Sequence, residues 1–164
     1  MRKEFFRKWF YLGVLFLLPV IFLLFLYPST HNYNPLDIVK TNVNDIEDFT
    51  FINDRKSLFR DNITVLSFLG NDPMSNITSV LNLKELVYDK FRGFKKFQIL
   101  TISTSGTELV LEEVKKEIQK SDELKYWYFA TGAPEQIQKL YNSLIKEVEL
   151  DTSLVTNQVF IIDK

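Results

Sequence analysis

The sequence of 164 residues contains no cysteine and one histidine, His31. The absence of cysteine excludes disulfide bonds, thiolate nucleophiles, CxxC redox pairs and cysteine-based zinc sites. A single histidine also excludes a metal site built from several imidazoles. Few of the common catalytic devices remain, and we expect no catalytic, cofactor-binding or metal-binding residues and no enzyme activity.

The chain also has almost no net charge. The chain has 20 Lys and Arg against 21 Asp and Glu, which gives a formal net charge of -1. Nucleic-acid-binding domains are usually strongly basic, so the composition predicts no nucleic-acid partner. The length suits one domain with an additional short segment.

Residues 9–27 form an uncharged, apolar run with Trp9, Tyr11 and Tyr27 near its ends. At about 1.5 Å per residue the run spans roughly 28 Å, close to the hydrocarbon thickness of a bilayer. Residues 1–8 carry four basic side chains and one acid, which predicts a cytoplasmic N-terminus. We therefore expect a single-pass membrane protein whose domain is extracytoplasmic, on the periplasmic side in a bacterium.

The sequence disfavours two other interpretations of this run. A cleaved signal peptide is disfavoured because the run is long and lacks small residues at the spacing of a cleavage site. A core helix of a soluble domain is disfavoured because the run has no polar face. An uncleaved membrane anchor remains the prediction.

The remainder of the chain divides into a linker and a domain. Residues 28–46 are polar, with Pro28, Pro35 and several asparagines, and predict a linker that includes His31. Residues 47–164 alternate between strand-like and helix-like patterns. Strands are predicted at 49–51, 63–69, 97–102, 126–130 and 159–162. Helices are predicted from Pro73 to about Phe91, from a capping-box spacing at Ser105 and Glu108, and from Pro134.

Helices that alternate with strands indicate an α/β domain with a mostly parallel central sheet. Within that class the chain resembles the thioredoxin-like Sco family of membrane-tethered copper-handling proteins. Four stretches carry the resemblance: residues 48–51 with 63–68, 70–73, 126–132 and 159–163. The resemblance implies a thioredoxin-like fold over residues 47–164, and a respiratory oxidase assembly component as partner.

The departures from the family pattern concern its copper ligands. In the Sco family, two cysteines in the loop after the first long strand and a later histidine bind copper. The corresponding loop here offers Asp72 and Asn76 around Pro73, and the later segment is Leu154 to Asn157. No metal ligand is carried over, so a divergent member without copper or thiol chemistry is predicted. Members of the family usually continue past the late strand, so we expect this domain to be either C-terminally incomplete at Lys164 or an unusually short member. A longer parent sequence or a strand from another chain would then cover its last strand.

Four features have both a functional and a structural interpretation, and the structural one is favoured for each. Asp72 is interpreted as a helix cap rather than a reactive or metal-binding acid, and Met74 as a surface or loop-packing residue rather than a copper ligand. Residues 103–106 could cradle an anion at a helix start, although helix caps use the same residues. Lys95, Lys96, Lys115 and Lys116 are interpreted as solvated charges.

Two functions from different classes remain open. The first is a non-catalytic binding or assembly factor of the Sco type, related to respiratory oxidase or copper-site assembly by resemblance. The alternative is a membrane-tethered interaction or scaffold module of the same fold that is unrelated to copper. Fold alone does not decide between them.

Overall fold

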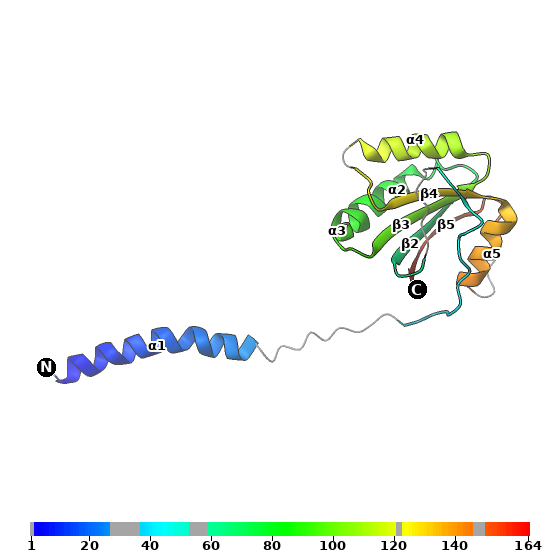
Figure 1. The fold of residues 1–164 in the computed structure, drawn as a ribbon. Coiled ribbons are helices and arrows are strands. Elements are labelled where there is room, and N and C mark those ends of the chain that lie inside the picture. The colour runs from blue at the N-terminus through cyan, green and yellow to red at the C-terminus, as the bar shows by residue number, and fades with distance from the viewer. Residues whose placement is uncertain (1, 27–36, 53–58, 121–122, 146–149) are drawn as a thin grey trace. The chain divides into compact units, whose positions relative to one another are not determined.

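The computed structural model describes residues 2–26, 37–52, 59–120, 123–145 and 150–164 (Figure 1). The chain divides into two compact units, Met1–Ile38 and Val39–Lys164. The second unit starts eight residues before the predicted domain boundary at residue 47. His31 lies outside the described residues.

The first unit contains the helix α1 (Arg2–Leu26), with Pro19 inside it. Its segment Lys3–Phe25 is long and apolar enough to cross a membrane. The helix begins earlier than the predicted run because the basic residues before Trp9 are helical as well. The evidence for a membrane span is the length and the apolar composition of this helix, and an N-terminal signal sequence has the same two features.

The second unit is built on a five-stranded sheet among the described residues, with strand order β1-β4-β3-β2-β5. The strands are β1 (Thr50–Phe51), β2 (Ile63–Gly70), β3 (Phe97–Thr104), β4 (Trp127–Gly132) and β5 (Val155–Asp163). The three central strands β2, β3 and β4 are parallel. The edge strands β1 and β5 run antiparallel to their neighbours.

This arrangement confirms the predicted α/β fold class. The two apolar runs at 63–69 and 97–102 form neighbouring strands that are buried on both faces, as expected for parallel strands covered by helices. The late strand is longer than predicted, because it begins at Val155 rather than Val159. Its direction was left open by the sequence pattern, and it is antiparallel.

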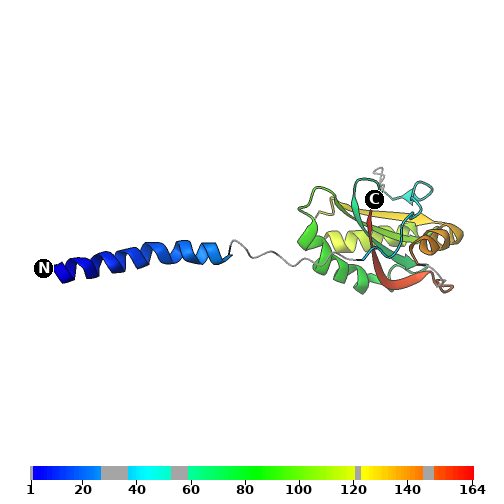
Figure 2. The same ribbon diagram turned by 90° about the horizontal axis from the view of Figure 1, so that it is seen from below.

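Helices cover both faces of the sheet (Figure 2). On one face lie α2 (Ile77–Leu83), the π-helical turn η1 (Lys84–Tyr88), α3 (Asp89–Phe91) and α4 (Glu108–Gln119). On the other lies α5 (Pro134–Leu144). Successive side chains of a strand point to opposite faces, so each strand supplies both layers. In β2, Leu66 and Phe68 pack toward α5, whereas Val65 and Leu69 pack toward α2 and α4.

Both hydrophobic clusters are made of residues from the second unit, and the apolar window of α1 has no buried side chains. The sheet lies in the same unit. Val39–Lys164 thus contains the whole described core.

Two predicted helix starts were wrong in position. The α2 helix begins at Ile77 rather than Pro73, because residues 73–76 form tight turns with Asn76 N donating to Pro73 O at 3.3 Å. Asp72 Oδ1 accepts from Ser75 N at 3.3 Å, so Asp72 caps this turn. At α4 the N-cap position is Thr107 rather than Ser105, which displaces the predicted capping box.

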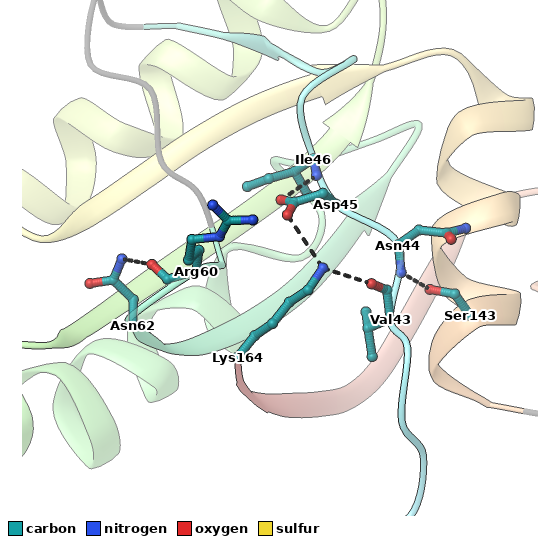
Figure 3. Close-up of polar contacts among 8 residues, drawn as sticks. All are labelled: Val43, Asn44, Asp45, Ile46, Arg60, Asn62, Ser143 and Lys164. Carbon is teal, nitrogen blue, oxygen red and sulfur yellow. Dashed lines mark hydrogen bonds and ion pairs between the residues drawn. The ribbon is translucent and has the colours of Figure 1, made fainter.

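Within the second unit, the segment before β1 contacts α5 and the C-terminal residue (Figure 3). Asn44 N donates to Ser143 Oγ at 3.1 Å, and the Lys164 ammonium lies 3.3 Å from Asp45 Oδ2. Lys164 also donates to the carbonyl of Val43 at 3.1 Å. Ile46 is fully buried in the α5-side core. The last residues of the predicted 28–46 linker are therefore packed against the domain.

Candidate functional site

The two segments that the resemblance marks as ligand positions meet at one end of the sheet. β2 ends and β5 begins there, with Leu69 opposite Val155 in the ladder. Just beyond, Asn71 N donates to the carbonyl of Ser153 at 3.0 Å. The Asn71 side-chain amide donates to the carbonyl of Thr152 at 2.9 Å. The tertiary structure thus brings residues 70–76 and 152–157 together, as the resemblance implies.

The end of β3 joins the same place. Thr104 Oγ1 donates to Asn71 Oδ1 at 2.7 Å, and Ser103 Oγ donates to the carbonyl of Gly70 at 2.6 Å. Ser103 and Thr104 are both buried. We refer to residues 70–72, 103–104 and 151–154 as the loop junction. Asn71 is its central residue, because it bonds to both of the other segments.

Two backbone positions show how closely these loops approach. Gly70 has φ +64°, and a Cβ atom built there would lie 2.0 Å from Ser153 O, so only glycine fits. Leu154 also has a positive φ of 55° and is buried at 7% exposure. The Asp151 side chain accepts from Ser153 N at 3.0 Å and from the Ser153 hydroxyl. The Ser153 hydroxyl bond lowers the pKa of Asp151 below its ordinary value.

A small groove runs between α2 and β5 beside the junction. Its walls are Asn76, Ser79, Val80 and Leu83 on the helix side and residues 155–159 on the strand side, over Ser67 to Leu69. Its volume is about 30 Å³. Organic ligand pockets are about ten times larger or more, so this groove has room for a few water molecules and not for an organic cofactor.

Asp72 and Asn76, which stand where the resemblance implies metal ligands, are engaged with the backbone, whereas Met74 is an exposed apolar side chain. The Asn76 amide donates to the carbonyls of Leu69 and Asp72 at 3.3 and 3.1 Å. Asp72 caps Ser75, as described above. In the part of the chain that the structure describes, no three His, Cys, Asp or Glu side chains are grouped so that they could hold a metal ion. The junction offers hydrogen-bonding groups in place of soft sulfur or imidazole ligands.

The second candidate, an anion cradle at residues 103–106, is occupied by the chain itself. Gly106 N donates to Glu108 Oε1 at 3.0 Å, and Thr131 Oγ1 donates to the same oxygen at 3.1 Å. The Gly106 bond lowers the pKa of Glu108 below its ordinary value, and the Thr131 hydroxyl contributes in the same direction. An external anion would have to displace this carboxylate.

Sequence reasoning missed the central position of Asn71, which it treated as part of a turn. It also missed a polar chain within the core. Trp127 Nε1 donates to Thr101 Oγ1 at 2.9 Å, and the Ser67 hydroxyl lies 3.0 Å from the same oxygen. Single polar residues inside apolar strands carry no periodic signal that would reveal such a contact.

Comparison with known proteins supports the fold. BsSco, described as a member of the Sco family of cytochrome c oxidase assembly proteins, is similar with TM-score 0.52 and 15% identity over 77% of this chain and 78% of that chain. Apo Sco1 from Thermus thermophilus has TM-score 0.44 and 18% identity, covering 74% of this chain and 78% of that chain. ScoI from Arabidopsis thaliana, solved with copper bound, has TM-score 0.41 and 19% identity, covering 69% and 73%.

No protein-family model matches the sequence, and no curated protein is a significant match. The structural similarity to BsSco covers most of both chains. It confirms the resemblance at the level of fold. This cysteine-free chain therefore has the thioredoxin-like fold of Sco-family proteins.

Proposed function

We propose that this chain is a membrane-anchored, extracytoplasmic binding or assembly factor that uses the Sco fold without metal or thiol chemistry. The loop junction carries this proposal. The segments that the resemblance associates with copper ligands adjoin this junction, where Asn71 bonds to Thr152 before β5 and accepts from Thr104 at the end of β3. A hydrogen-bonded junction keeps the shape of this surface without a metal ion, which suits recognition of another protein.

The proposed role is non-catalytic, and the same residues support this part of the proposal. General acid–base or nucleophilic catalysis needs a reactive side chain that is exposed to substrate and positioned by a partner group. Asp72 and Asn76 are bonded within their own turn, and Ser103 donates to the carbonyl of Gly70 at the end of β2. These side chains stabilise the loops, which leaves the outer surface of the junction for contacts with a partner.

The proposed partner is a respiratory oxidase subunit or a copper-loading protein under assembly, by analogy with the assembly role stated for BsSco. The full chain, tagged at its C-terminus, is crosslinked in intact membranes and purified in detergent. A matched control joins residues 1–38 to an unrelated soluble domain, which identifies proteins retained by the helix alone. Oxidase subunits enriched over this control support the proposal. Envelope structural proteins in their place would favour the scaffold alternative, unrelated to copper.

The proposed membrane topology places the N-terminus in the cytoplasm and the domain outside it. The basic residues before Trp9 and the apolar α1 support this orientation. A reporter that is active only outside the cytoplasm is fused after Ile38, because residues 39–46 belong to the compact unit. Activity of a cytoplasmic reporter at this position would reverse the orientation. Release of the reporter from the membrane by cleavage would show that the helix is a signal peptide.

A further inference from the structure

The turn between α3 and β3 concentrates cationic and aromatic side chains. Residues 90–97 contain Lys90, Arg92, Lys95 and Lys96, three phenylalanines and no acid. The chain as a whole has a net charge of -1, so this segment differs sharply from the rest. Asp89, which precedes it, lies 3.4 Å from the ammonium of Lys84. We refer to residues 90–97 as the basic–aromatic loop.

Two of the three rings of this loop are exposed, and their positions are fixed by contacts with the rest of the domain. Phe94 is 62% exposed and Phe91 is 45% exposed, whereas Phe97 is buried in the sheet. The Phe91 ring centroid lies 6.0 Å from that of Phe94 and 5.8 Å from that of Phe97, so the exposed rings lean on a buried one. Backbone bonds from Phe94 N to Phe91 O and from Phe97 N to Phe94 O hold the turn. The loop presents its rings to solvent without needing to reorganise.

The apolar surface continues from the loop onto the adjoining edge of the sheet. Ile63 pairs with Phe97 in the β2–β3 ladder and is 44% exposed. On the neighbouring strand, Ile161 pairs with Val65 and is 61% exposed. Residues two apart on a strand share a face, so Ile63 and Ile161 are diagonal neighbours on one face. Exposed apolar side chains therefore extend from the loop across β2 to β5.

We propose that the basic–aromatic loop binds the surface of an anionic lipid bilayer. Segments that lie in the membrane interface combine lysines and arginines with apolar rings, which enter the boundary between headgroups and acyl chains. Lysine stems can lie along apolar surface while their ammonium groups contact anionic headgroups. The surface of an anionic bilayer offers headgroup charge for the cations and an apolar layer for the exposed rings of Phe91 and Phe94 at the same place, whereas an acidic segment of a protein offers charge alone. If α1 spans the membrane as proposed, the domain is held near a bilayer, where even weak contact is effective.

The test uses residues 39–164, which contain the described core and lack α1, so the outcome does not depend on the proposed anchor or partner. Sedimentation is measured with vesicles of phosphatidylcholine alone and of phosphatidylcholine mixed with phosphatidylglycerol. We expect binding to the anionic vesicles that decreases as salt is added. Each lysine near such a surface contributes about fivefold in affinity, so Lys95→Gln with Lys96→Gln should weaken binding roughly 30-fold. Phe94→Ser should weaken it by roughly tenfold through lost apolar burial.

Matched controls come from α4. Lys116→Gln with Lys120→Gln removes the same charge, and Leu109→Ser removes a side chain that is 79% exposed. Both controls should bind as the unmodified domain does, and circular dichroism establishes that every variant is folded. Equal binding to neutral and anionic vesicles, no binding to either, or equal losses in the α4 variants would each overturn the proposal. Binding to polyglutamate without vesicle binding would assign the loop to an acidic protein and overturn it as well.

Discussion

The side-chain amide of Asn71 donates to the carbonyl of Thr152 at 2.9 Å, and so joins two loops that are 81 residues apart in sequence. The same side chain accepts from Thr104, so one residue of the loop after β2 connects the end of β3 with the loop before β5. In Sco-family proteins, as the resemblance implies, the ligands of a copper ion come from segments near these two loops. In this chain, hydrogen bonds of Asn71 hold the loops together.

Replacing Asn71 with alanine should lower the free energy of unfolding of residues 39–164 by about 1–2 kcal/mol, because two side-chain hydrogen bonds are lost and the Thr104 hydroxyl loses its acceptor. Asn157→Ala, at an exposed position of β5, is the control and should change it by less than about 0.5 kcal/mol. Urea denaturation measures both. A double-mutant cycle of Asn71→Ala with Thr104→Val should show coupling, and strict additivity would contradict the proposed bond.

Residues 39–164 should not bind copper tightly. Copper(I) selects thiolate and thioether ligands and copper(II) favours imidazole, and this unit contains no cysteine, no histidine and one methionine, Met74. Equilibrium dialysis against a competing chelator measures both oxidation states. Stoichiometric copper retained at sub-micromolar free metal would contradict the prediction. Asp72→Ala should cost about 1 kcal/mol of stability, as for a lost cap.

Thr101→Val should destabilise the domain by about 1–3 kcal/mol, because the buried Trp127 N–H and the Ser67 hydroxyl lose their shared partner. Thr101→Ser keeps the hydroxyl and should cost less. Chemical denaturation followed by Trp127 fluorescence compares the two variants. Equal stabilities of the valine and serine variants would show that the hydroxyl contributes nothing.

Alanine substitutions of the two adjacent isoleucines of β5 should differ strongly in their cost in stability. Ile162 is 5% exposed and packs in the α5-side core, whereas Ile161 is 61% exposed. Ile162→Ala should cost about 2–4 kcal/mol and Ile161→Ala less than about 0.5 kcal/mol. Similar losses at both positions would mean that Ile161 is covered in solution, and measurement of oligomeric state would then test whether a second copy covers it.

Glu108 should titrate below the ordinary glutamate range, because Gly106 N–H and Thr131 stabilise its charged form. A pKa lowered on folding stabilises the folded state above the unfolded pKa, about 4.3, and this contribution is lost as the pH falls through the folded pKa. The stability difference between the unmodified domain and Glu108→Gln should therefore shrink on acidification. NMR titration of the carboxyl carbon measures the pKa directly. A value at or above the ordinary one would contradict the contact.

The amino-acid sequence by itself determined the features that depend on residue types and local periodicity. The lack of cysteine holds for any fold, and the apolar runs at 63–69 and 97–102 indicated strands buried on both faces. Helices between them indicated right-handed crossovers and hence parallel strands. These inferences succeeded because apolar patterning reports burial directly.

The tertiary structure decided what lies next to what. Asn71 becomes the centre of the junction only because β2 and β5 pair and bring Thr152 beside it. The start of α2 at Ile77 depends on turns at 73–76 that local cap signals do not distinguish from a first helical turn. Contacts between distant residues depend on chain packing, which neither periodicity nor capping signals encode.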